Sequence, residues 1–181
     1  MKEKEKAFPR LLFILPLSLL LVLGVLYGYG LAFDPNKQPS RLIGKTLPLV
    51  TLPRLANTQQ HISTAHFKTP AVINIWASWC GACRAEHELL MKIAAQQQFF
   101  VYGVAYQDDL DNARAYLQAQ GNPFVETLFD GAMISAAPFE VLSVPQTYIV
   151  DKSGHIRARH IGKLTQEVWQ ALQATLNQGV N

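Results

Sequence analysis

Two cysteines stand out in this chain of 181 residues, because Cys80 and Cys83 are its only thiols and two residues separate them. A disulfide that closes so short a loop removes little entropy from the unfolded chain, so it would add little stability. At the start of a helix, the dipole and free backbone N–H groups favour a thiolate on the first cysteine, and the second lies within reach to resolve a mixed disulfide. The pair therefore predicts thiol–disulfide exchange, with Cys80 as the nucleophile and Cys83 as the resolving thiol.

A zinc site and a purely structural disulfide are the two other interpretations of this pair. Zinc would need two further ligands, and neither a second cysteine pair nor a His-x₃-His pair follows in the sequence. The short loop argues against a structural disulfide. We therefore expect redox exchange, with no metal and no cofactor.

The residues on either side of the pair predict a strand and a helix that would position it. Residues 71–77 form a short apolar, β-branched run, which is typical of a buried central strand. After the cysteines, residues recur at helical spacing at Glu86, Leu89, Leu90, Ile93 and Ala94. A strand, the cysteine pair and a helix in this order make the motif more specific than the two cysteines alone.

The remaining pattern predicts an α/β domain. Further strands are expected at residues 47–52, 99–105 and 124–129, and a hairpin at 145–151 and 155–161. Asp109 and Thr165 are the expected N-caps of two more helices, and Gly121 the expected end of the first. The net charge of +3 gives no electrostatic argument for a nucleic-acid partner.

The N-terminal part of the chain predicts a membrane anchor. Residues 11–33 carry no charge, and a helix of that length spans about 34 Å, enough for a bilayer core of roughly 30 Å. Lysines and an arginine within residues 1–10 predict a cytoplasmic N-terminus. Residues 34–41 would form a polar linker, and residues 42–181 an exported domain. A cleaved signal peptide is the alternative, but its apolar region would normally be shorter.

The exported part resembles the thioredoxin fold and, more narrowly, the CcmG (DsbE) family of membrane-anchored thiol:disulfide interchange proteins. The segments that carry the resemblance cover most of the domain in the same order. They are Leu42-Ile-Gly-Lys45, Asn74-Ile-Trp-Ala-Ser-Trp-Cys80, Cys83-Arg-Ala-Glu-His87, Gly121-Asn-Pro-Phe124, Leu128-Phe-Asp-Gly131 and Val144-Pro-Gln-Thr-Tyr-Ile-Val-Asp151. The resemblance implies a thioredoxin-like α/β fold, a central mixed sheet flanked by helices, after one N-terminal transmembrane helix.

The resemblance also implies a function. Members of this family stay reduced in the periplasm and keep the cysteines of apocytochrome c, or of a thioreductase partner, reduced for haem attachment. A transmembrane electron donor of the DsbD or CcdA kind supplies their electrons. The expected location is the bacterial inner membrane, with a single span and the C-terminal domain in the periplasm.

Further site residues follow from the same resemblance. Pro145 is expected to be a cis-proline facing the cysteines, and Trp79, Val144 and Gln146 are expected to line the substrate groove with it. Glu86 is expected to tune the thiol pKa or relay a proton. Asn74 stands where general thioredoxins carry a buried aspartate.

Each of the last two residues also has a plainer interpretation. Glu86 would then be a solvated helix residue, and Asn74 a buried amide with its hydrogen bonds satisfied. The histidines are expected at the surface, with His87 alone near the site.

The sequence departs from the family pattern beside the thiols. Gly81-Ala82 replaces the usual Pro-Thr or Pro-Val between the cysteines, and Gln146 stands where the family often has glutamate. Two rival functions remain open: a general periplasmic disulfide oxidant, and a docking module of the haem-attachment assembly with secondary thiol chemistry.

Overall fold

The structure is a computed structural model that describes residues 11–32 and 40–177. The chain divides into two compact units, and the boundary lies between residues 38 and 39. The first unit contains α1 (Leu11–Ala32), a helix with Pro16 inside it, and the side chains described in α1 are exposed. The predicted cytoplasmic segment 1–10 and nearly all of the predicted linker 34–41 lie outside the described residues.

The predicted N-terminal helix is thus observed, but its role as a membrane span is a separate question. Within the two described ranges, no helix meets the combined length and hydropathy that a membrane crossing would require. The transmembrane anchor stays a prediction from the sequence.

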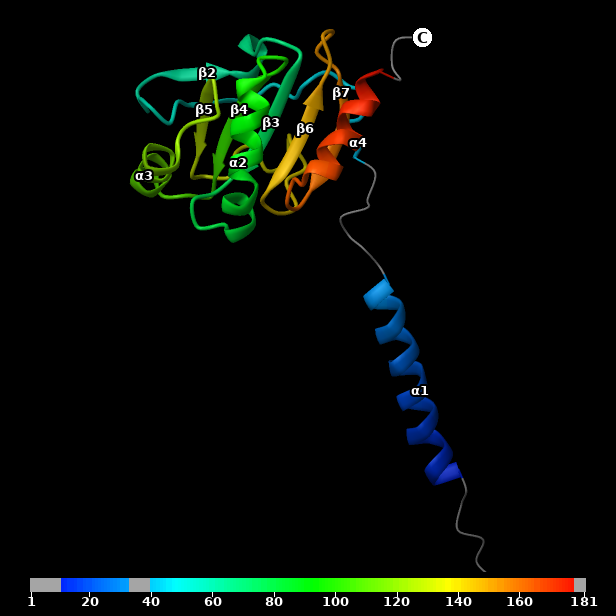
Figure 1. The fold of residues 1–181 in the computed structure, drawn as a ribbon. Helices are drawn as coiled ribbons and strands as arrows, with labels where there is room; N and C mark the ends of the chain where they lie inside the picture. The colour runs from blue at the N-terminus through cyan, green and yellow to red at the C-terminus, as the bar shows by residue number, and fades with distance from the viewer. Residues whose placement is uncertain (1–10, 33–39, 178–181) are drawn as a thin grey trace, which may run out of the picture. The chain divides into compact units, whose positions relative to one another are not determined.

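Over residues 40–177, the second unit is built on two sheets and three α-helices (Figure 1). In chain order its elements are β1 (Thr51–Pro53), β2 (His61–Ser63), the 3₁₀ turn η2 (Thr64–His66), β3 (Ala71–Trp76), α2 (Gly81–Ala95), β4 (Phe100–Tyr106), α3 (Leu110–Gln120), β5 (Glu126–Asp130), β6 (Gln146–Val150), β7 (Ile156–Ile161) and α4 (Gln166–Asn177). The main sheet has the strand order β5-β4-β3-β6-β7. β3 pairs in parallel with β4 and antiparallel with β6, so the sheet is mixed, as predicted.

β3 is the middle strand of this sheet, and all six of its residues are buried. Its side chains alternate between two cores, as the pleat of a strand requires. Val72 and Trp76 join the core beneath the helices, whereas Ile73 and Ile75 join the core on the other face. The apolar run at residues 71–77 therefore predicted this strand correctly, because a strand buried on both faces has no polar alternation.

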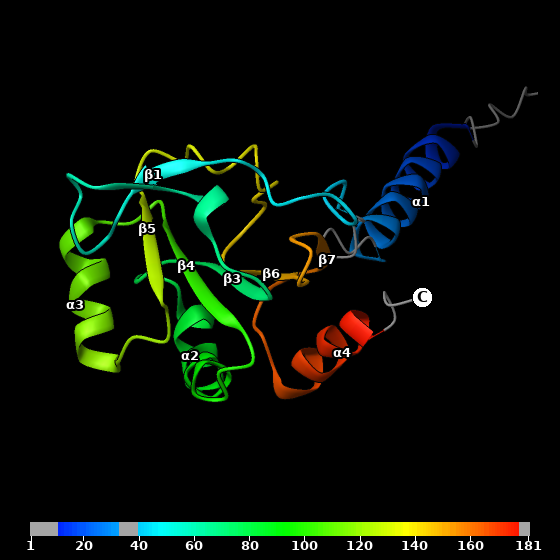
Figure 2. The same cartoon turned by 90° about the horizontal axis from the view of Figure 1, so that it is seen from above.

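The helices of the second unit all lie on one face of the main sheet (Figure 2). The other face is covered by β1, β2, η2 and the loop that joins β5 to β6. The helices therefore flank the sheet on one face and not on both. The loop between β5 and β6 covers part of the face that has no helix, and Phe139 within it is fully buried.

Most of the predicted elements are confirmed, and one is largely wrong. Asp109 caps α3 by accepting from the backbone N–H groups of Asp111 and Asn112, and Gly121 ends that helix with φ 88°. The hairpin β6–β7 is present. The strand expected at residues 47–52 is reduced to β1, which pairs with the unpredicted strand β2 outside the main sheet.

Candidate active site

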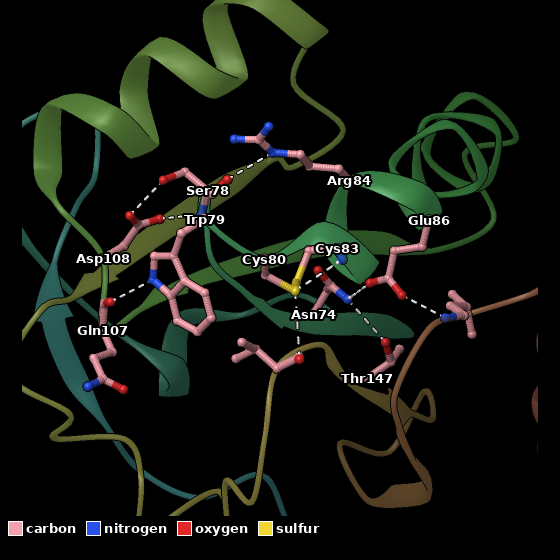
Figure 3. The surroundings of a disulfide bond; sticks show 12 residues. Asn74, Ser78, Trp79, Cys80, Cys83, Arg84, Glu86, Gln107, Asp108 and Thr147 are labelled. Atoms are coloured by element: carbon pink, nitrogen blue, oxygen red, sulfur yellow. Dashed lines mark hydrogen bonds between the residues drawn. A yellow bond between two sulfur atoms is a disulfide. The ribbon is translucent and has the colours of Figure 1, made fainter.

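The two cysteines lie just after β3, at the start of α2, and they form a disulfide (Figure 3). Cys80 is the N-cap of α2, and its Sγ accepts a hydrogen bond from the Cys83 backbone N–H at 3.1 Å. The same N–H would stabilise a Cys80 thiolate after reduction. Cys80 is 6% exposed and Cys83 4%, so the two residues are buried to a similar degree in this oxidised state.

A carboxylate outside the motif holds the loop that precedes Cys80. Asp108, just beyond β4, accepts from the Ser78 backbone N–H at 2.5 Å and from the Ser78 hydroxyl at 2.7 Å. Trp79 donates its indole N–H to the Gln107 carbonyl at 2.9 Å. Trp79 nevertheless remains 58% exposed, so its ring lies at the surface next to the disulfide.

Glu86 is buried on the same face of α2 as Cys83, one turn further along the helix. Its side chain is only 1% exposed, which rules out the solvated interpretation. One carboxyl oxygen accepts from Asn74 at 2.8 Å and the other from the Leu164 backbone N–H at 2.6 Å. Burial raises the Glu86 pKa from 4.5 to about 7, although both hydrogen bonds and nearby Lys163 act in the opposite direction.

The strand register explains why Asn74 meets Glu86. Asn74 shares its face of β3 with Val72 and Trp76, beneath the helices, and pairs with Thr147 on β6. Its amide nitrogen donates to Glu86 and to the Thr147 hydroxyl at 3.1 Å. The Asn74 carbonyl oxygen is buried without a partner in the described part of the chain. The plainer interpretation, a buried amide with all its hydrogen bonds made, therefore holds for the amide nitrogen and not for the amide oxygen.

The loop before β6 brings a carbonyl group to the reactive sulfur. The Val144–Pro145 peptide bond is cis, as predicted, and the Val144 carbonyl oxygen lies 3.7 Å from Cys80 Sγ. Trp79 and Val144 both line a groove of about 310 Å³, together with Tyr106, Gln107 and residues 141–143. Because Trp79 directly precedes Cys80 and the Val144 carbonyl oxygen contacts the Cys80 sulfur, this groove lies beside the disulfide.

Gln146 does not line this groove, contrary to the expectation. It is fully buried, because it pairs with Ile75 on the sheet face opposite Asn74. Its amide nitrogen donates to the Phe139 carbonyl at 3.1 Å and to the Tyr148 hydroxyl at 2.8 Å, and its amide oxygen accepts from the Leu142 N–H at 3.3 Å. Gln146 thus ties down the loop that carries Val144 and acts behind the site.

His87 also differs from its predicted surface position. It is buried, contacts the Tyr116 ring edge-on at 5.2 Å, and its Nε2 lies 3.1 Å from the Gly121 carbonyl oxygen. This side of α2 faces α3 and Gly121, the residue at which α3 ends. The imidazole ring therefore packs between the two helices. Within residues 11–32 and 40–177, no three His, Cys, Asp or Glu side chains are placed to hold a metal ion.

Several residues of the site carry no signal in the sequence. The Leu164 N–H and Thr147 reach Glu86 and Asn74 from distant parts of the chain. Asp108 and Ser78 look like ordinary loop residues. The one available hint for Asp108 is its position directly after a buried strand that is parallel to β3, since such strand ends meet at one edge of a sheet.

Comparison with known proteins identifies the class of protein that has this fold and site. The model of the Redoxin family matches residues 42–175. A secreted thiol-disulfide isomerase from Corynebacterium glutamicum has the same fold, with a TM-score of 0.66 at 21% identity over 80% of this chain and 94% of that one. With its disulfide at a helix N-terminus, the protein is a thiol:disulfide oxidoreductase with a thioredoxin-like fold.

Closer relatives narrow the class. The thiol:disulfide interchange protein DsbE of Pseudomonas aeruginosa is 35% identical over 93% of this chain and 94% of its own length. The DsbE protein of Yersinia pestis is 38% identical over 93% and 92%, respectively. The chain belongs to the DsbE family of thiol:disulfide interchange proteins.

Proposed function

We propose that this protein is a membrane-anchored periplasmic reductase, which keeps the cysteines of apocytochrome c or of a thioreductase partner reduced for haem attachment. The observation that supports electron transfer from this protein to its substrate is the buried carboxyl group of Glu86, which lies on the Cys83 face of α2. A carboxylate there opposes thiolate formation and so offsets part of the stabilisation that the Cys83 N–H gives the reduced protein. A protein whose reduced form is strongly stabilised is an oxidant, so a weaker stabilisation of the reduced form favours a reductant.

The exchange reaction balances with the residues at hand. The Cys80 thiolate attacks one sulfur of the substrate disulfide, and the other substrate sulfur leaves as a thiolate. Cys83 then loses its proton and attacks the Cys80 sulfur, which releases the second substrate thiol. Two electrons pass to the substrate, and this chain ends with the Cys80–Cys83 disulfide. Glu86, with a pKa of about 7, is matched to accept the Cys83 proton near neutral pH.

The oxidised product must be reduced again in a compartment that favours disulfides. The proposed source is a transmembrane electron donor of the DsbD or CcdA kind. The proposed anchor is the N-terminal segment at residues 11–33, which carries no charge and follows a stretch rich in lysine. A single span in this orientation would place the second unit in the periplasm, across the membrane from the N-terminus.

A complementation experiment tests this proposal. In a strain lacking the gene, we expect haem attachment to c-type cytochromes to fail, and the wild-type chain to restore it. The Cys80→Ser, Cys83→Ser double variant should not restore it. Full restoration by that variant would show a docking module instead, and normal haem attachment in the deletion strain would refute the proposal.

A trapping experiment identifies the partner. The Cys83→Ala variant cannot resolve its mixed disulfides, so Cys80 should accumulate adducts with apocytochrome c or a thioreductase in the cell. The matched control is Cys80→Ala, which lacks the attacking sulfur and should form none of them. Adducts with many unrelated exported proteins would contradict the proposal and favour a general oxidant.

A further inference from the structure

A second hollow shares Trp79 with the substrate groove. It has a volume of about 570 Å³ and opens between the loop before α2 and the helix α3. Its lining consists of Ser78, Trp79, Arg84, Asn112, Ala115, Tyr116 and Gln120. Because Trp79 lines both hollows and precedes Cys80 directly, a polypeptide that reaches the disulfide through the groove passes close to this second hollow.

Two contacts restrict the side chain of Arg84, an exposed residue in this hollow. Arg84 Nε donates to the Ser78 carbonyl at 3.0 Å, and Figure 3 shows the side chain reaching back along the loop to make this bond. The guanidinium group also lies over the Tyr116 ring, 5.8 Å from its centroid. Tyr116 is in turn packed against Trp76 and His87. These contacts restrict the side chain before a ligand binds, so binding costs less side-chain entropy.

The terminal nitrogens of Arg84 have no partner in the described part of the second unit. Within residues 40–177, its two terminal nitrogens form no hydrogen bond and no ion pair. Among the described residues, no carboxylate lines the hollow. Asp108, behind Ser78, is occupied by three hydrogen bonds from Ser78 and the Asp109 N–H. The terminal nitrogens of Arg84 thus form a free planar donor pair beside the Tyr116 ring.

We infer that this hollow is a subsite for a carboxylate side chain of the partner polypeptide, bound by the terminal nitrogens of Arg84. A guanidinium group binds a carboxylate through two parallel hydrogen bonds, which fixes both position and orientation. The amides of Asn112 and Gln120 add neutral donors at the same wall. An acidic residue near the partner's cysteine would then set the register in which its disulfide meets Cys80.

This inference rests on the exchange activity alone and not on which partner is used in the cell. The test uses the full-length protein, reduced, in neutral detergent micelles. The probes are short synthetic peptides with an internal disulfide, in which one flanking position at a time carries glutamate or its neutral counterpart glutamine. The measured quantity is the second-order rate constant of peptide reduction.

We expect a glutamate peptide to react about fivefold faster than its glutamine counterpart at one or two flanking positions, as for an ion pair near the surface. This preference should disappear in Arg84→Gln and should shrink at about 1 M salt. The glutamine peptide serves as the internal reference, because any effect of Arg84 on the Cys80 thiolate changes the rates of both peptides equally. Lys92→Gln, an exposed change further along α2, should keep the full preference.

The charge-reversal variant provides the decisive comparison. In Arg84→Glu, a lysine peptide should become the faster substrate at the same flanking position. The inference is wrong if no position shows a preference in the wild-type protein, or if the preference survives Arg84→Gln. If the wild-type protein shows the glutamate preference but the wild-type chain fails to restore haem attachment in the deletion strain, the proposed cellular function is refuted and this subsite remains in place.

Discussion

Asn74 donates a hydrogen bond to Glu86 across the contact between the central strand and the helix that carries the cysteines, with a distance of 2.8 Å. The strand register places Asn74 on the helix face, and the helical spacing places Glu86 one turn beyond Cys83. The neutral amide cannot carry a charge, so Glu86 is the group of this pair that titrates. It does so near neutral pH, because burial raises its pKa.

The first prediction concerns stability against pH. Glu86 binds its proton more tightly in the folded protein, with a pKa of about 7 against 4.5 for the ordinary carboxyl group. Proton binding by Glu86 therefore stabilises the folded state. This contribution to the unfolding free energy is complete below about pH 4.5 and is lost as the pH rises through 7. The loss amounts to about 3 kcal/mol. Urea unfolding of the oxidised protein, followed by tryptophan fluorescence between pH 4.5 and 8, measures it.

Glu86→Gln is the matched variant for this prediction. Its carbonyl oxygen can accept from the Leu164 N–H, and its amide can donate to the unpaired carbonyl oxygen of Asn74 after a flip of that side chain. We expect it to fold and to lose most of the decline in stability between pH 4.5 and 8. Its rate of exchange should also lose the step near pH 7. An unchanged pH profile would show that another group titrates.

The second prediction concerns the loop before the cysteines. Asp108→Ala leaves the Ser78 N–H and hydroxyl without their acceptor, and Ser78 is buried. The expected cost is about 1–3 kcal/mol of unfolding free energy, together with slower exchange, because the position of Cys80 depends on this loop. Asp111→Ala, an exposed change in α3, should cost less than about 1 kcal/mol. Equal effects of the two variants would contradict the role of Asp108.

The third prediction concerns the residue that ties down the loop carrying Val144. In Gln146→Glu, a carboxylate would face the Phe139 carbonyl, the Glu140 carbonyl and the Tyr148 hydroxyl, three groups toward which the amide now donates. The new carboxyl group should therefore keep its proton at neutral pH, and the loop should loosen as the pH rises. Hydrogen exchange of the Leu142 amide, measured from pH 6 to 9, reports this opening after correction for intrinsic exchange.

Gln146→Leu is the control for the loop, since it removes the same hydrogen bonds and adds no titrating group. Its loop should be loosened by a similar amount at every pH. If Gln146→Glu shows no more pH dependence than Gln146→Leu, the amide does not hold the loop in the way described.

The fourth prediction concerns packing beneath the site. A Cβ added at Gly103 on β4 would lie 2.9 Å from Phe124 Cδ2 and 2.9 Å from Trp76 Nε1, both in the core. Gly103→Ala should therefore destabilise the protein by about 1–3 kcal/mol. Gly81→Ala has no atom within 4 Å of the new Cβ and should leave stability unchanged or slightly higher. Equal denaturation midpoints for the two variants would contradict this account of the core.

The sequence predicted the parts of the site that depend on which segments follow one another directly in the chain. The β3 strand, the cysteine pair and α2 follow one another directly, so composition and spacing were sufficient. The burial of Gln146 and His87 was not predictable in this way, because neither residue type is usually fully buried. The faces that these side chains occupy follow from strand register and from packing against α3. The strand β2 was not predicted, because it has only three residues, and so short a segment among polar residues shows no alternation of polar and apolar side chains.

The reduction potential of the Cys80–Cys83 pair tests the central claim most directly. The full-length protein is equilibrated in dithiol–disulfide buffers at pH 7, and the fractions of thiol and disulfide are measured by alkylation and mass spectrometry. A reductase that works beside a buried carboxyl group should have a potential far below about −120 mV, the value of a strong oxidant. A potential near −120 mV would contradict the claim that this disulfide protein delivers electrons.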